Sequence, residues 1–232
     1  MRTGWLKTMA DALRGLMFPR CCPVCRRALS DGEPYVCRQC MDTLPRLNHR
    51  PDRMNEVEEV FVGSRVVTRA FSLFRYHRSS DHAGIIKEIK YYNNPRLAEF
   101  LGGQLAEEMA RQGFFDGLDA IVYVPLHPRK ESRRGYNQSR HIARGISRVS
   151  GLPVEDFLRA DQPHRSQTNK TLEQRRKNVE GIFSASPSVA GKRLLLVDDV
   201  ITTGSTMLAC CDVMQQAGVS EVRILSLAFA NL

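Results

Sequence analysis

The chain has 232 residues, and its 34 lysines and arginines outnumber its 25 aspartates and glutamates, which gives a net charge of +9. This charge favours polyanionic ligands such as phosphates, pyrophosphate or nucleic acid. The 42% of hydrophobic residues is ordinary for a globular protein. No apolar run approaches the roughly 18 residues that a membrane-spanning helix needs, so we expect no integral membrane segment.

The first twenty residues, "MRTGWLKTMADALRGLMFPR", carry apolar side chains at helical spacing, interrupted by charged ones. This pattern predicts a short amphipathic helix rather than a secretory signal. A helix lying on a membrane surface is the alternative, but docking on the rest of the protein is favoured. We therefore expect a cytoplasmic protein.

Five of the seven cysteines lie near the N-terminus, where Cys22-x-x-Cys25 is followed by Cys37-x-x-Cys40. Each pair can turn two thiolates towards one metal ion, and two pairs complete a tetrahedral site. Disulfides are the alternative, but a chain without a secretory signal keeps its thiols reduced. The spacing therefore predicts a structural Zn²⁺ site, in which Cys21 could replace Cys22 as a ligand.

The cysteine segment and the preceding helix are expected to form an N-terminal domain over residues 1–50, and residues 51–232 a second domain. In the second domain the pattern predicts two antiparallel strands within 60–77 that turn at Gly63-Ser64, helices over 79–94 and 95–113, a strand over 120–124, a helix over 137–151, a strand over 193–197, a helix over 204–218 and a strand over 220–230. Alternating strands and helices with short connections predict an open parallel sheet covered on both faces.

Two adjacent acids, Asp198 and Asp199, follow the apolar run in "LLLVDDVITTGST". Open α/β sheets bind ligands beyond the carboxyl ends of their strands. Neighbouring carboxylates repel, and burial raises the pKa of one of them unless something compensates. The two hydroxyls of a ribose would donate hydrogen bonds to such a pair, and a nearby Mg²⁺ would stabilise its ionised form.

The turn after the acids contains Thr202, Thr203, Gly204, Ser205 and Thr206 and leads into a predicted helix. Its backbone N–H groups and hydroxyls can surround a phosphate at the positive end of that helix. A glycine permits the close backbone approach that a side chain would obstruct. The turn is not a Walker P-loop, because no Gly-Lys-Ser/Thr follows.

The stretch "LLLVDDVITTGST" resembles the phosphoribosyl pyrophosphate (PRPP) signature of type I phosphoribosyltransferases. The order of "IKEIKYY", "VPLHPRKESRRGYNQS", "SQTNKTLEQRRKNVEGIF" and this signature, after a four-cysteine segment, resembles the ComF (competence protein F) family over about residues 19–230. The resemblance implies a type I phosphoribosyltransferase fold, an open and mostly parallel α/β sheet with a small hood, plus an N-terminal zinc ribbon.

The same resemblance implies roles for individual residues. Asp198 and Asp199 would bind the ribose hydroxyls, and the turn from Thr202 to Thr206 would bind the 5′-phosphate. The pyrophosphate loop would contain Arg129, Arg133 and Arg134. The hood would contain Gln167, Thr168, Arg175, Arg176 and Asn178. For Lys87 and Lys90 two interpretations remain open, contact with the phosphates or an exposed helix face.

The enzymatic hypothesis is phosphoribosyl transfer from Mg²⁺·PRPP to an unidentified acceptor, through an oxocarbenium-like transition state. Its catalytic residues would be Asp198, Asp199, Arg133 and Arg134. The sequence shows no readable site for an acceptor base. Tyr136 and Phe183 are the candidates for such a site, although a structural role is favoured for each.

Two other functions use the same segments. The family resemblance points to natural transformation, in which the basic loops would track single-stranded DNA and the competence helicase machinery would be a partner. The pocket could also serve a PRPP sensor without turnover. A phosphorylated nucleotide is a further ligand that such a pocket could hold.

Overall fold

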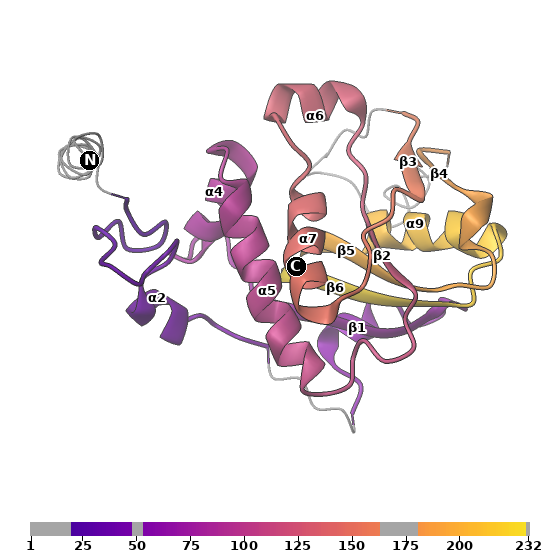
Figure 1. Cartoon of the computed structure of the whole chain (residues 1–232), viewed down its shortest axis with the longest axis horizontal. Coiled ribbons are helices and arrows are strands. Elements are labelled where there is room, and N and C mark those ends of the chain that lie inside the picture. The colour runs from indigo at the N-terminus through magenta and orange to yellow at the C-terminus, as the bar shows by residue number, and fades with distance from the viewer. Residues whose placement is uncertain (1–19, 48–52, 163–180, 231–232) are drawn as a thin grey trace, which may run out of the picture.

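The computed structural model describes residues 20–47, 53–162 and 181–230. Its centre is a four-stranded parallel sheet (Figure 1), which confirms the predicted open α/β architecture. The spatial order of its strands is β1 (Val67–Arg75), β6 (Glu221–Phe229), β5 (Arg193–Ile201) and β2 (Ala120–Tyr123). A single bridge between Ile121 and Val154 adds a short parallel segment beyond β2.

Strand β5 lies between β6 and β2, and its apolar run Leu194–Val197 is fully buried. A central strand of a parallel sheet is covered on both faces, so it reads as a continuous apolar run rather than as an alternating one. The register pairs Leu195 with Arg223 of β6 and with Ile121 of β2. The sequence run thus becomes the middle of the core.

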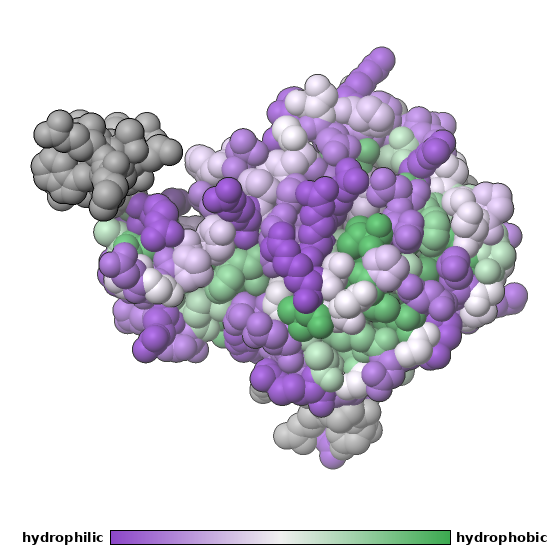
Figure 2. All heavy atoms as spheres, viewed as in Figure 1, coloured by the Kyte–Doolittle hydropathy of each residue, from purple (hydrophilic) through white to green (hydrophobic). Residues whose placement is uncertain are grey.

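Three helices cover the two faces of the sheet (Figure 1). Helices α5 (Pro95–Ala110) and α7 (Gln138–Ser150) lie side by side on one face, and α9 (Ser205–Gln216) lies on the other. In the same view, hydrophilic side chains lie over α5 and α7 (Figure 2). No helix within the described ranges is long and apolar enough to cross a bilayer.

Close contact between α5 and the middle of α7 fixes the position of α7. A Cβ on Gly145 would lie 2.0 Å from the carbonyl oxygen of Glu99, and one on Gly102 would lie 2.4 Å from that of Ile142. Only glycine permits such an approach of two helix backbones. Asn137 then caps α7 by accepting a hydrogen bond from the N–H of Arg140.

The prediction of two antiparallel strands within residues 60–77 is wrong. The chain first forms α3 (Glu56–Glu59), and only β1 in the second half is a strand, which pairs in parallel with β6. The reason lies upstream, where the Asn55 side chain accepts hydrogen bonds from Val57 and Glu58, and the Glu58 side chain accepts one from the Asn55 N–H. This capping box starts a helix and carries residues 60–62 into its final turn.

Two short strands, β3 (Leu158–Ala160) and β4 (Phe183–Ala185), pair antiparallel, and a 3₁₀ turn over Pro187–Val189 follows. The predicted hood residues 167–178 follow β3 in the sequence and lie outside the described residues. Residues 1–19, which contain nearly all of the expected N-terminal helix, also lie outside them.

The cysteine segment, with its helix α2 (Arg38–Asp42), packs beside α4 (Ala83–Tyr91) and α5 (Figure 1). The carbonyl oxygen of Cys40 lies 3.3 Å from Nε2 of His82, the residue before α4. The rings of Tyr35 and Phe100 lie 5.4 Å apart. The segment thus contacts the first turn of α4 and the flank of α5.

Candidate functional site

The two acids lie within β5 rather than after it, which corrects the expected strand end at residue 197. Asp198 pairs in register with Ser226 of β6, and Asp199 is buried with 6% of its surface exposed. The strand continues because its ladder with β6 runs on to Ile201. Both carboxylates therefore leave a rigid backbone at the carboxyl end of the sheet, where open α/β folds bind their ligands.

Both oxygens of the Asp199 carboxylate are held by side chains from helices. Lys90, from the last turn of α4, places its Nζ 3.0 Å from Oδ1. Gln138, the first residue of α7, donates from Nε2 to Oδ2 at 2.9 Å. Asp199 therefore has partners on two sides.

The partners of Asp198 offset a negative charge less strongly than those of Asp199 do. Its Oδ1 accepts hydrogen bonds from the Ser139 hydroxyl at 2.7 Å and from the Asp199 N–H at 2.8 Å. Burial and then repulsion by Asp199 raise the pKa of Asp198 to about 7, because these bonds and the charge of Lys90 offset them only in part. The pair thus carries less than two full negative charges near neutral pH.

Lys90 remains an ammonium in this position. Burial lowers the pKa of Lys90, but the attraction of Asp199 and Asp198 outweighs burial, so the net shift is upward. Lys90 contacts Asp199, whereas Lys87 is exposed on the same helix. Gln138 and Ser139 were not predicted as site residues, although their place directly after the helix cap Asn137 is the signal that could have identified them.

The carbonyl oxygen of the Gln138 side chain is buried and accepts no hydrogen bond from the described residues. A buried acceptor without a donor costs about 1–3 kcal/mol. Since the other end of the same amide holds Asp199, this oxygen lies beside the acids. A hydroxyl donor on a bound ligand would satisfy it.

The predicted phosphate turn joins β5 to α9. Gly204 has a φ of +68°, which places it in the left-handed region at the N-cap of this 12-residue helix. A Cβ there would lie 2.4 Å from Cγ1 of Val60, so the turn after α3 packs directly against it. The hydroxyls of Thr203 and Ser205 lie 2.9 Å apart. Backbone and hydroxyl donors are thus gathered at a positive helix end.

The expected pyrophosphate loop is a short helix, α6 (Pro128–Arg134), capped by His127. Arg129 and Arg133 are exposed on it, whereas Arg134 is half-buried. Lys130, which was not predicted, is also half-buried. Burial and then the charges of Arg134 and Lys90 lower the pKa of Lys130, so these three cations share one neighbourhood with the acids.

The four predicted zinc ligands come together near α2. The sulfur atoms of Cys22, Cys25, Cys37 and Cys40 all lie within 4.8 Å of one another. Cys21 is exposed and lies outside this group. Four sulfur ligands at such distances fit a tetrahedral Zn²⁺.

The electrostatics of the cluster also suit a metal. Burial raises the pKa of Cys37, but hydrogen bonds from the Cys40 backbone and the Arg27 guanidinium outweigh it and lower the pKa to about 6. A thiol of this kind readily forms the thiolate that binds metals.

Comparison with known proteins agrees with this geometry. Residues 133–231, which contain α7, the two acids and the turn, match the family model of the phosphoribosyl transferase domain. Competence protein F of Haemophilus influenzae is 34% identical over 116 residues, which cover 48% of this chain and 51% of that protein. Competence protein ComFC of Streptococcus pneumoniae is 24% identical over 156 residues, covering 67% of this chain and 66% of that protein.

These matches support a phosphoribosyltransferase-like protein of the ComF family. It also resembles the DNA utilization protein YhgH of Escherichia coli K12, with 29% identity over 144 residues, which cover 60% of this chain and 63% of that protein. The chain thus matches about half to two thirds of the length of these curated relatives.

Similarity to solved structures is lower. The glutamine PRPP amidotransferase of B. subtilis has a TM-score of 0.42 and 24% identity, and the match covers 60% of this chain and 30% of that one. The adenine phosphoribosyltransferase of Saccharomyces cerevisiae has a TM-score of 0.35 and 19% identity, with 61% and 72% covered. The family assignment therefore rests on the family model and the curated relatives.

Neither residue considered for base binding presents an open ring. Tyr136 is 8% exposed, and its hydroxyl donates to the carbonyl oxygen of Ile89, while Phe183 is 6% exposed. Both rings are buried, which agrees with the structural role that the sequence favoured for each. Tyr91 and Tyr92, which directly follow Lys90 along the chain, carry exposed rings.

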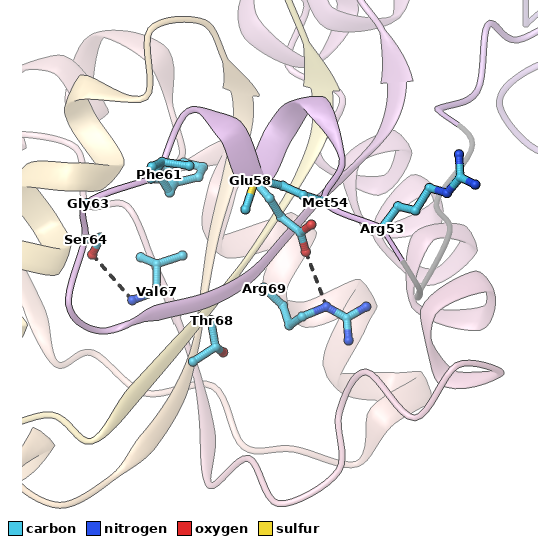
Figure 3. Close-up of a pocket in the computed structure, with 10 residues that line it drawn as sticks. Arg53, Met54, Glu58, Phe61, Gly63, Ser64, Val67, Thr68 and Arg69 are labelled. Atoms are coloured by element: carbon cyan, nitrogen blue, oxygen red, sulfur yellow. Dashed lines mark hydrogen bonds and ion pairs between the residues drawn. The ribbon is translucent and has the colours of Figure 1, made fainter.

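A separate pocket lies beside α3 and the start of β1 (Figure 3). It contains the ion pair between Arg69 and Glu58, whose Nε and Oε1 are 3.3 Å apart. The lining residues are Arg53, Met54, Glu58, Phe61, Val62, Gly63, Ser64, Val67, Thr68 and Arg69. None of these is a predicted site residue, although Phe61 also approaches Gly204.

The cysteine geometry predicts a difference between two neighbouring substitutions. Cys22→Ser removes one of four clustered sulfurs, so we expect bound zinc to fall from about one per chain to below half and the melting temperature to drop by several degrees, since metal binding is coupled to folding. Cys21→Ser is the matched control and should leave both quantities unchanged. Metal analysis and thermal unfolding measure them, and equal effects of the two substitutions would contradict the ligand set.

The raised pKa of Asp198 predicts a pH dependence of stability. Between its ordinary pKa near 3.9 and its folded value of about 7, the folded protein retains a proton that the unfolded chain has lost, so the free energy of unfolding falls as pH rises. Asp198→Asn removes this loss. We subtract the melting temperature of wild type from that of the variant and expect this difference to be roughly 4 °C larger at pH 8 than at pH 5.

The control for this experiment is Asp81→Asn, which changes an exposed aspartate before α4. Its difference from wild type should stay constant over the same pH range. A constant difference for Asp198→Asn as well would show that Asp198 is ionised throughout.

Proposed function

We propose that this chain binds the ribose 5-phosphate part of PRPP or a related phosphorylated ligand, and that it is a phosphoribosyl (pentosyl) transferase with an unidentified acceptor. One observation carries the proposal. The buried acids at the end of β5 are followed within five residues by a left-handed glycine at the N-terminus of α9. A diol-binding group and an anion-binding group thus stand next to each other, as a ribose 5-phosphate requires.

The ribose would bind at the acids. Its hydroxyls would donate to Asp198 and Asp199, and one of them would also satisfy the buried oxygen of Gln138. The phosphate would bind the backbone and hydroxyl groups from Thr202 to Thr206. With this assignment the two adjacent carboxylates, which repel each other, would both accept hydrogen bonds from the ligand.

The pyrophosphate of PRPP would face α6. Arg129, Arg133 and Arg134, together with Lys130, would stabilise the negative charge that develops as pyrophosphate leaves. Mg²⁺ bound with the ligand would neutralise part of the same charge. The carboxylate and amide oxygens of the site are of the kind that a hard cation prefers.

We also propose that the four-cysteine cluster holds a structural Zn²⁺. All four cluster positions are sulfur, which leaves no open position for a substrate. Its contribution would be to fold the ribbon that packs against the first turn of α4.

The transferase proposal predicts that Mg²⁺·PRPP stabilises the protein and binds through Asp199. Asp199→Asn removes a charged acceptor of the ribose hydroxyls, so we expect PRPP affinity to fall by at least about tenfold, since a hydrogen bond to a charged group is worth roughly 1.5–3 kcal/mol. Isothermal titration calorimetry measures this affinity. The exposed-site variant Asp81→Asn is the control and should bind as wild type does.

If Asp199→Asn bound PRPP as tightly as wild type, the assignment of the acids would be wrong. If PRPP bound normally but no pyrophosphate appeared with any nucleobase or amine acceptor, the chain would be a PRPP sensor rather than a transferase. Ribose 5-phosphate and pyrophosphate as separate ligands would show which half of PRPP supplies the affinity.

A second function, the handling of single-stranded DNA in transformation, is favoured by a specific surface. Tyr91 and Tyr92 are 72% and 65% exposed, and the Arg134 guanidinium lies 6.0 Å from the centre of the Tyr91 ring. Exposed aromatic rings beside cations stack the bases and neutralise the backbone of single strands. The names of the relatives, competence and DNA utilization proteins, agree with this function. The competence helicase machinery would then be a further partner.

The DNA hypothesis predicts that a single-stranded oligonucleotide binds with a steep salt dependence. Tyr91→Ala should weaken binding by roughly 5- to 100-fold, since one stacked base is worth about 1–3 kcal/mol. Replacing both Arg133 and Arg134 with Ala should weaken it and also flatten the salt dependence. Fluorescence anisotropy at several salt concentrations measures both effects.

The control is Arg148→Ala, which removes an exposed arginine of α7 that pairs with Glu99. It removes one positive charge, against two for the Arg133/Arg134 double variant, and it does so in the last turn of α7 rather than in α6. Equal losses for Arg148→Ala and Tyr91→Ala would show general charge attraction rather than a stacking surface.

A further inference from the structure

Lys90 reaches the acids from a helix that is fixed at both ends. Before the first turn of α4, Nε2 of His82 lies 3.3 Å from the Cys40 carbonyl oxygen. At its last turn, the Tyr136 hydroxyl donates to the carbonyl of Ile89, the residue before Lys90. The position of the Lys90 backbone is therefore set by its surroundings and not only by its ion pair.

The environment of the Lys90 ammonium is that of a buried group. Its side chain is 24% exposed and that of Asp199 only 8%, and their charged atoms are 3.0 Å apart. A lysine stem is long and flexible enough to place its charge in water, as the exposed Lys87 one turn earlier shows. Lys90 instead lies against the carboxylates, which indicates that its charge is needed there.

A divalent ion bound directly by Asp199 would compete with this ammonium. Asp199 Oδ1 already contacts Lys90, and Oδ2 accepts from Gln138. Since a magnesium–oxygen bond is about 2.1 Å long, an ion on Oδ1 would lie within roughly 5 Å of the ammonium. Half-buried Lys130 and Arg134 would add to the repulsion.

We propose that Lys90 is the resident cation of this site. Its ammonium fills the place beside Asp199 that a divalent ion would otherwise take, so the ligand-free protein does not bind Mg²⁺ at the acids. Metal then enters only together with a phosphorylated ligand that brings its own oxygen ligands. Lys90 retains two further N–H donors, which can turn to the anionic oxygens of that ligand while the third stays on Asp199.

This proposal deepens the proposed function, because it concerns the cation requirement of the same site, but its main test uses Mg²⁺ alone. Thermal unfolding and calorimetry with MgCl₂, and no other ligand, should show no binding to the wild-type protein at the acids. Lys90→Met keeps most of the length of the side chain and removes the charge. It should acquire Mg²⁺ binding, with a rise in melting temperature of roughly 3–6 °C when Mg²⁺ is about tenfold above its dissociation constant.

Two further variants separate this effect from general destabilisation. Adding Asp199→Asn to Lys90→Met should abolish the Mg²⁺ response. The matched control Lys87→Met removes an exposed lysine of the same helix and should behave as wild type. If Lys90→Met does not fold, Lys90→Gln, which still donates a hydrogen bond to Asp199, carries the same expectation.

The proposal is overturned if wild type binds Mg²⁺ in a manner that Asp199→Asn abolishes, or if a folded Lys90 variant shows no more Mg²⁺ response than wild type. The first outcome needs no Lys90 variant. A separate titration with Mg²⁺·PRPP tests the proposed function. If PRPP fails to bind while Lys90→Met gains Mg²⁺ binding, the ligand assignment fails and the role of Lys90 stands.

Discussion

The repulsion between two carboxylates on adjacent residues of a buried strand is the constraint on which this site depends. Their own strand contributes the Asp199 N–H, which donates to Asp198, and this single bond does not offset the repulsion. The compensation comes from Lys90 on α4 and from the start of α7, which are remote in the sequence. The parallel sheet positions the acids, and the helices on one face supply the charge and hydrogen bonds that stabilise the acids there.

The N-terminal cysteine segment takes part in this arrangement through α4. It contacts the beginning of that helix at His82, while Lys90 at the other end of the same helix contacts Asp199. A helix transmits position over its length because its backbone hydrogen bonds make it stiff. A zinc ion that folds the ribbon would therefore act on the site without touching a ligand, by fixing the entry of α4 into the core.

Sequence patterns predicted the elements of the parallel domain well, because continuous apolar runs and helical periodicity report burial directly. They failed within residues 60–77, where apolar residues at alternate positions fit both a strand and the end of a capped helix, and where Asn55 and Glu58 upstream decide between the two. Periodicity also left Lys90 undecided. It places a residue on a helix face, but it does not say whether a long side chain points to water or to a carboxylate of a strand more than a hundred residues later.

The charges of the site suit both proposed functions, phosphoribosyl transfer and the binding of single-stranded nucleic acid. Lys90, Lys130 and Arg134 surround two carboxylates, of which Asp198 is only partly ionised near neutral pH. The balance is positive, so any ligand with a sugar and phosphates is attracted. The exposed rings of Tyr91 and Tyr92 follow Lys90 directly along the chain. If a ribose binds at the acids as proposed, its base could stack on these tyrosines, whether it belongs to an acceptor or to a nucleotide of a single strand. The two proposed functions would then share the acids and differ in what the tyrosines contact.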